Sequence, residues 1–143
     1  MNRFAIALMA LSALFGTASI AHKYEGGITA EPISIQNKST DILGNPFHYE
    51  KGTPSITPLN VTLGPLEETN WHKHNVPLWV YVIEGSFVVD YGSKGKKTIH
   101  KGMSYIEPMN WCHKGINGHK ESKAIIFYMG QVGTKNHAEC KRQ

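Results

Sequence analysis

The chain alternates between short apolar stretches and clusters of turn residues from about residue 55 to residue 130. Residues 78–83 (LWVYVI) and 86–91 (SFVVDY) are rich in aromatic and β-branched side chains, and glycine-containing turns follow both. Short strands with turn signals every eight to twelve residues are typical of an all-β sandwich or barrel. Beyond the first 21 residues, no segment of helical length has a 3.6-residue apolar period. The other predicted strands are residues 57–63, 97–100, 104–107 and 123–129.

The N-terminal segment has a different pattern, an apolar run over residues 4–15 that follows the positively charged start MNR. Ser19 and Ala21 then fit the small-x-small pattern of a cleavage site, so residues 1–21 are predicted to be a signal peptide. The run is shorter than the roughly 20 apolar residues of a membrane-spanning helix. We therefore expect an exported protein, periplasmic or secreted, with no membrane attachment after cleavage.

The chain after residue 21 is long enough for one compact domain but not for two. Composition divides it into three parts. We expect residues 22–54, rich in Gly, Ser, Asn and Pro, to form an N-terminal arm that packs on a barrel or pairs with a neighbouring subunit. The barrel is predicted over residues 55–130, and residues 131–143 form a C-terminal tail.

The charge of the chain is modest, with a formal net charge of +4 at pH 7. Its lysines are scattered through turns and the tail, and they form no basic stripe interleaved with aromatic residues. That distribution is typical of a solvated surface and argues against nucleic-acid binding.

Two cysteines are present, Cys112 and Cys140. In an oxidising compartment an even count permits one disulfide, which would tie the tail to the middle of the chain. The alternative is a buried Cys112 beside an exposed, unbonded Cys140. Geometry decides between the two, and the sequence leaves both open.

Three histidines carry the main candidate chemistry. His72 and His74 have the i, i+2 spacing that puts both side chains on one face of a strand. His113, from a distant strand signal, would complete a set of three neutral nitrogen ligands for one divalent transition metal (Fe, Mn, Zn, Ni or Cu). The alternatives are an exposed polar strand face and a barrel that holds no metal. We favour a metal site in the mouth of a small barrel.

The spacing around the first two histidines resembles the first motif of the cupins. That motif has two histidines one residue apart, then a glutamate, then a glycine. His72, His74 and Gly85 fit it, whereas Leu78 stands where the glutamate belongs. The second cupin motif is matched at every interval by Gly102, Pro108, His113 and Asn117, although Asn110 replaces its usual internal glycine.

The resemblance implies a cupin-type jelly-roll β-barrel, also called a double-stranded β-helix, which in many members holds one metal and pairs as a homodimer. Known members include dioxygenases, isomerases, oxalate-degrading enzymes and binding modules, so the family barely selects a reaction. The missing carboxylate at Leu78 leaves a cation held by three neutral ligands with its full charge. It disfavours oxalate chemistry and is compatible with three-histidine ferrous dioxygenases.

Four side chains are predicted to line the substrate pocket: Leu78, Trp79, Tyr81 and Trp111. For any one of the aromatic residues, filling the core is the competing interpretation.

No general base stands out in the sequence. Glu84 and Glu107 lie at predicted strand ends, where we expect them to serve turns or the surface rather than the site.

These patterns predict an exported metalloprotein, a dioxygenase-like oxidoreductase that acts on a small oxygen-rich or phenolic molecule. Two alternatives remain from the sequence. The barrel could bind a metal or small ligand without catalysis, or it could be an inert dimeric unit.

Overall fold

The computed structural model describes residues 22–23, 29–49 and 51–142. The predicted signal peptide, residues 1–21, lies outside the described residues. The chain divides into two compact units, residues 1–32 and 33–143. In the first unit, β1 (His22–Lys23) and β2 (Thr29–Ala30) form a short antiparallel pair.

The second unit is a β-barrel, and its only helical element within the described residues is a short 3₁₀ turn, η1. Within those residues no helix is long and apolar enough to cross a membrane. This architecture confirms the predicted all-β fold. The elements are β3 (Pro54–Leu63), β4 (His72–His74), β5 (Leu78–Glu84), β6 (Ser86–Asp90), η1 (Gly92–Lys94), β7 (Lys96–His100), β8 (Ser104–Glu107), β9 (Lys114–Asn117), β10 (Ser122–Gln131) and β11 (His137–Glu139).

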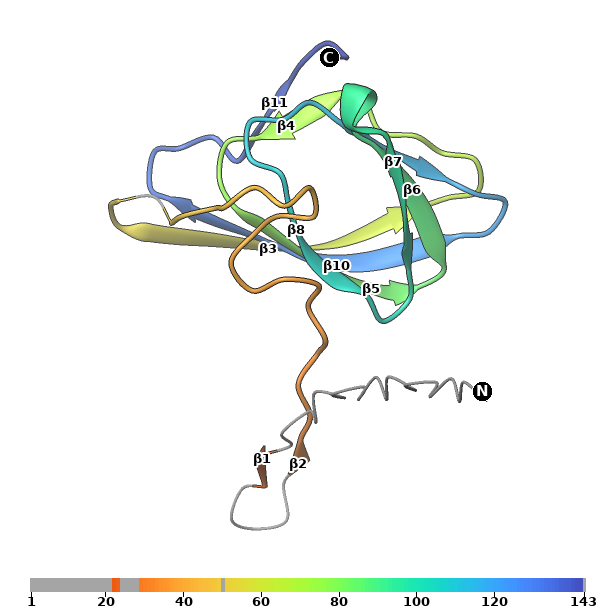
Figure 1. Cartoon of the computed structure of the whole chain (residues 1–143). Helices are drawn as coiled ribbons and strands as arrows, with labels where there is room; N and C mark the ends of the chain where they lie inside the picture. The colour runs from red at the N-terminus through yellow and green to blue at the C-terminus, as the bar shows by residue number, and fades with distance from the viewer. Residues whose placement is uncertain (1–21, 24–28, 50, 143) are drawn as a thin grey trace, which may run out of the picture. The chain divides into compact units, whose positions relative to one another are not determined.

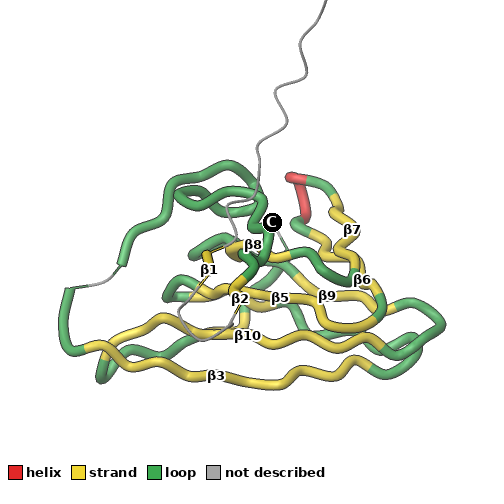
Figure 2. The backbone as a smooth tube through the Cα atoms, turned by 90° about the horizontal axis from the view of Figure 1, so that it is seen from below, coloured by secondary structure: helices red, strands yellow, loops and turns green. Residues whose placement is uncertain are grey.

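The strands form a four-stranded sheet in the order β3-β10-β5-β8, a three-stranded sheet in the order β7-β6-β9, and the pair β11-β4. Figure 1 shows β4 and β11 on the side of the barrel opposite β3 and β10, and Figure 2 shows how β3 and β10 run side by side along their length. Every strand pairing within these sheets is antiparallel.

The core is built by strict alternation along the central strands. In β5, Leu78, Val80 and Val82 are buried, while Trp79 and Tyr81 between them lie on the opposite face. Strand β10 repeats this alternation over its full length, with every second residue buried. One face of each strand therefore points into the barrel.

A glycine and two polar side chains secure one end of the barrel. Gly85 joins β5 to β6 with φ 71°, a left-handed conformation that suits glycine. The Asn117 amide donates to the Leu63 carbonyl over 2.8 Å, and its oxygen accepts from the Ser122 hydroxyl, also over 2.8 Å. Two positions that match the cupin motifs, Gly85 and Asn117, therefore serve the fold.

The part of the N-terminal arm that belongs to the second unit lies against β8. Ile35 forms a parallel bridge with Ser104, and the Ile42 amide donates to the Ile106 carbonyl over 2.9 Å. These contacts satisfy backbone groups along the outer edge of β8, which would otherwise be a free sheet edge.

Candidate metal centre and ligand pocket

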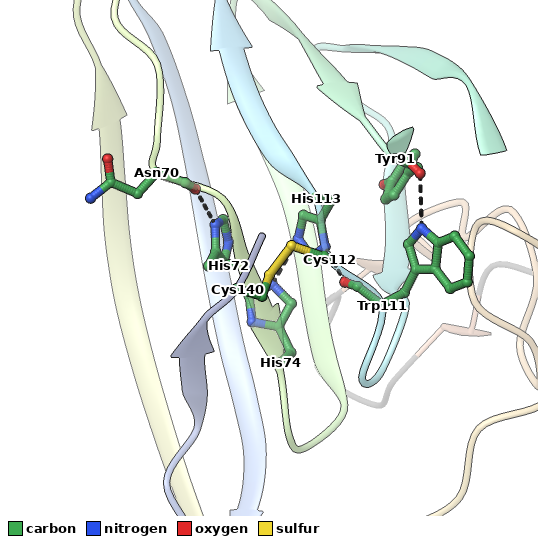
Figure 3. Close-up of a disulfide and its surroundings, with 8 residues drawn as sticks. All are labelled: Asn70, His72, His74, Tyr91, Trp111, Cys112, His113 and Cys140. Atoms are coloured by element: carbon green, nitrogen blue, oxygen red, sulfur yellow. Dashed lines mark hydrogen bonds between the residues drawn. A yellow bond between two sulfur atoms is a disulfide. The ribbon is translucent and has the colours of Figure 1, made fainter. Parts of the chain in front are cut away.

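The three histidines converge from two segments that the fold brings side by side. His72 and His74 lie at the two ends of β4, and His113 lies directly before β9. His72 and His113 form an antiparallel bridge, each amide donating to the other's carbonyl over 2.9 Å. One ligand nitrogen from each ring lies within 4.8 Å of the other two, and Figure 3 shows the three rings turned toward one another.

Main-chain carbonyls fix the proton positions on two of the rings. Nδ1 of His72 lies 2.8 Å from the carbonyl oxygen of Asn70, and Nδ1 of His113 lies 2.9 Å from that of Trp111. A carbonyl can only accept, so each Nδ1 must carry the proton. In the neutral form of each ring, Nε2 is therefore left with a free lone pair, as a metal ligand requires.

The third ring, His74, provides a test of whether a cation fits. Its Nε2 lies 3.1 Å from Nε2 of His113, and its buried Nδ1 has no hydrogen-bond partner among the described residues. If Nδ1 carries the proton, two lone pairs face each other at close range. A cation shared by these nitrogens would turn that repulsion into attraction, so the donor set fits a divalent transition metal.

The surroundings keep two of the rings neutral. Burial lowers the pKa of His72 below its ordinary value of 6.5, and the positive charge that His113 can carry lowers it further. Burial lowers the pKa of His74 more strongly, with neighbouring histidines acting in the same direction. Neutral imidazoles are the form that binds metals.

A carboxylate also enters the site, which the sequence did not lead us to expect. Glu107 is only 5% exposed, and its Oε2 lies 3.7 Å from Nε2 of His113. Tyr91 donates its hydroxyl to Oε2 and Tyr105 donates to Oε1, each over 2.9 Å. The prediction that Glu107 serves a turn or the surface is therefore wrong. Glu84, in contrast, is exposed and pairs with Lys123.

The tyrosines that hold Glu107 stay protonated over a wide pH range. Burial raises the pKa of Tyr91 and Tyr105 well above 10, and the charge of Glu107 raises both further. Both hydroxyls are therefore available as donors. No single sequence signal marks this cluster, because Tyr105 and Glu107 share β8 whereas Tyr91 follows the end of β6.

A pocket of about 230 Å³ opens beside the histidines inside the barrel. The histidines, Glu107 and Tyr105 form its polar end, and most of the remaining wall is aliphatic or aromatic. The volume lies below the roughly 300–1,000 Å³ of drug-sized sites, so the pocket suits a small molecule. Apolar lining residues include Val61, Leu63, Leu78, Val80, Phe87 and Ile126.

Of the four side chains predicted to line the pocket, the structure places only Leu78 there. Trp79 and Tyr81 lie on the outer face of β5, where their rings stack with centroids 6.1 Å apart. Trp111 points away from the histidines, and its indole donates to the Tyr91 carbonyl over 2.9 Å (Figure 3). Both faces of β5 are apolar, so alternation could not show whether Trp79 and Tyr81 point into the barrel or away from it.

The two cysteines form a disulfide in the structure, Cys112–Cys140, with a Cα–Cα distance of 6.0 Å. Strand β11 pairs with β4, so that His137 lies opposite His74. The Cys140 amide also donates to the Trp71 carbonyl over 3.1 Å. The tail is thus attached to both segments that carry the histidines.

Residues 59–129 match the family model described as Cupin domain. This match identifies residues 59–129 as a cupin domain, in agreement with the barrel and the histidine cluster. No curated protein matches the chain. A match to solved structures at low identity supports the fold alone.

Three similar structures illustrate that fold. The DMSP lyase DddQ from Ruegeria pomeroyi has 14% identity and a TM-score of 0.54, with 76% of this chain and 50% of that chain covered. An uncharacterized protein with a double-stranded β-helix domain from Klebsiella pneumoniae has 16% identity and a TM-score of 0.52, covering 67% and 86%. Oxalate decarboxylase from Bacillus subtilis has 17% identity and a TM-score of 0.53, covering 61% and 24%. The chain spans only half or less of the DMSP lyases it matches, 45% of one and 50% of another.

Proposed function

We propose that this cupin is a metal-dependent oxidoreductase of the dioxygenase type, in which His72, His74 and His113 hold one divalent transition metal. The observation that carries the proposal is the convergence of three imidazoles at the polar end of an otherwise apolar pocket. A redox-active metal would supply Lewis acidity and electron exchange with O₂. The metal that suits this chemistry best is iron, with Mn, Ni, Cu and Zn as the other members of the predicted set.

The pocket favours one of the two substrate classes predicted from the sequence. An oxygen-rich molecule would lose most of its hydrogen bonds against aliphatic walls such as those of Val80 and Ile126. A small phenolic molecule can place its ring among these side chains and its hydroxyl at the histidines. The chain's residues would therefore orient the substrate with its oxygen toward the metal and exclude water from the ring.

Export is part of the proposal. The segment over residues 1–21 has the composition of a signal peptide. The disulfide Cys112–Cys140 supports the same location, because disulfides persist in the periplasm and outside the cell but are rare in the cytosol. Fractionation of cells that express the full chain, followed by mass measurement of the N-terminus, tests it.

A homodimer is also proposed. Strand β3 lies at the edge of its sheet, and Ile56 on it is 54% exposed although it is apolar. A large apolar side chain on an open strand edge favours pairing with a second copy. Light scattering during size-exclusion chromatography measures the mass directly.

The metal is tested by elemental analysis of protein purified without chelators and without a His-tag. Wild type should contain close to one metal per chain, and a His72→Ala/His113→Ala variant should contain only traces. His100→Ala is the matched control, because His100 is an exposed histidine on β7. If wild type contains only traces of metal even after reconstitution, the proposed metal site is wrong.

Catalysis is tested separately by O₂ consumption with a panel of catechols and simple phenols. If the protein is an oxidoreductase, O₂ consumption should stop in the His72→Ala/His113→Ala variant and continue in His100→Ala. Binding of a phenol without turnover would instead assign the protein to the non-catalytic cupins, and binding of neither metal nor phenol would indicate an inert barrel.

A further inference from the structure

Strand register places a carboxylate where the first cupin motif is incomplete. Leu78 on β5 stands directly opposite Glu107 on β8 in the antiparallel pair. Directly opposed residues project to the same face of a sheet, with Cβ atoms about 4.5–5.5 Å apart. Both side chains are buried and both line the pocket. Glu107 therefore presents its carboxylate on the wall from which a glutamate at position 78 would project.

The carboxylate is oriented and still has coordination capacity. Oε2 accepts one hydrogen bond from Tyr91, and Oε1 accepts one from Tyr105. A carboxylate oxygen has two lone pairs, so each oxygen retains one. Oε2 is also the oxygen that lies 3.7 Å from the ligand nitrogen of His113. A cation held by that nitrogen is accordingly within reach of Oε2.

We propose that Glu107 is the anionic ligand of the metal centre, supplied by β8 in place of the residue missing from β5, and that Tyr91 and Tyr105 position it. This inference rests on the proposed metal site. A three-histidine, one-carboxylate set carries a negative charge, and its oxygen donor suits Mn²⁺ and Fe²⁺ better than an all-imidazole set does. The alternative is a buried acceptor that serves the two tyrosine hydroxyls and never binds the metal.

The test is titration of metal-free protein with Co²⁺, whose visible spectrum reports both the affinity and the donor atoms. Glu107→Gln keeps the size of the side chain and removes the charge. We expect it to weaken Co²⁺ binding roughly 10–100-fold and to change the spectrum of the bound ion. Glu84→Gln, at an exposed glutamate on β5, is the matched control and should change neither.

Two further variants keep the proposal falsifiable if Glu107→Gln folds poorly. Leu78→Glu/Glu107→Leu moves the carboxylate to the opposed position and should recover most of the affinity lost in Glu107→Leu alone. Tyr91→Phe retains the carboxylate but frees Oε2, so it should alter the spectrum without abolishing binding.

The outcomes separate this inference from the function on which it rests. If wild type binds no Co²⁺, both the metal site and the role of Glu107 fail. If wild type binds Co²⁺ and Glu107→Gln matches it in affinity and spectrum, the metal site stands and Glu107 is only a structural acceptor.

Discussion

Cys140 is bonded to Cys112, the residue directly before His113, so the end of the chain is fastened to the segment that carries a candidate metal ligand. The strand that precedes Cys140 pairs with β4, which carries the other two histidines. One covalent bond and one short strand pair thus connect the tail to both parts of the centre.

Removing the disulfide should lower the free energy of unfolding. The bond closes a loop with a sequence separation of 28, and loss of such a crosslink costs about 2–5 kcal/mol. Urea unfolding of Cys112→Ser/Cys140→Ser beside wild type measures the loss. Added reductant should destabilise wild type toward the variant and leave the variant unchanged. Equal unfolding midpoints without reductant would contradict the prediction.

Gly85→Ala should destabilise the barrel more than Gly102→Ala does. Both glycines have positive φ, so each alanine costs about 1–2 kcal/mol of backbone strain. At Gly85 the new Cβ would also lie 2.5 Å from Ser122 Oγ and 2.7 Å from the Glu121 carbonyl oxygen. At Gly102 it would meet no described atom within 4 Å.

The clash should add about 1–3 kcal/mol at Gly85, measured by urea unfolding. An equal loss of unfolding free energy in the two variants would show that the atoms around Gly85 move aside without a measurable cost.

The metal-free protein should lose stability as the pH falls below about 6.5. The pKa values of His72 and His74 in the folded state lie below the ordinary 6.5, so between those values the unfolded chain binds more protons. The free energy of unfolding then rises with pH across this window and is fully present above 6.5. Urea unfolding from pH 5 to pH 8 measures it.

His74→Gln should flatten this dependence, because it removes the histidine whose pKa is lowered most strongly by burial. His119→Gln, at an exposed histidine, should leave the slope unchanged. A slope that is the same in both variants would mean that another group governs the acid response.

Filling the pocket should separate ligand binding from metal binding. Ala124 is buried and lines the pocket, whereas Ile125 next to it on β10 lies on the other face. Ala124→Phe should occupy the space of the substrate and weaken phenol binding at least about tenfold, or roughly 1.4 kcal/mol. Metal content should not change.

Ile125→Phe is the control for this prediction and should bind phenol as wild type does, by calorimetry or fluorescence. Undiminished phenol binding by Ala124→Phe would place the ligand outside the barrel.

The strands with strong apolar character were predictable. Residues 104–107 were predicted as a strand, and β8 has those bounds. The strand β4 was predicted from the spacing of its two histidines, whereas β9 and β11, with four and three residues and no apolar alternation, were not predicted. Strand β11 forms by pairing with β4. In that pair His137 lies opposite His74, which is 63 residues earlier in the sequence (137 − 74). Local sequence does not contain that pairing.

The candidate site likewise contains residues that local sequence signals reveal and residues that only the fold brings together. The histidines could be found because an i, i+2 pair and a spaced motif are local signals. The role of Glu107 could not, because a glutamate at a strand end is usually solvated. Tyr105, on the same strand, donates to one carboxylate oxygen, but Tyr91, which donates to the other, follows the end of β6 and is brought there by folding. Pairings across strands, rather than residue types, decided this part of the centre.

The acceptors for His72 and His113 are main-chain carbonyls, each two residues earlier in the chain. Every amino acid carries that carbonyl, so substitution of the side chain at Asn70 or Trp111 leaves the acceptor in place as long as the backbone keeps its path. The path of the backbone therefore sets the tautomers of these two imidazoles. The site can vary in the side chains around it without changing which nitrogen faces the metal.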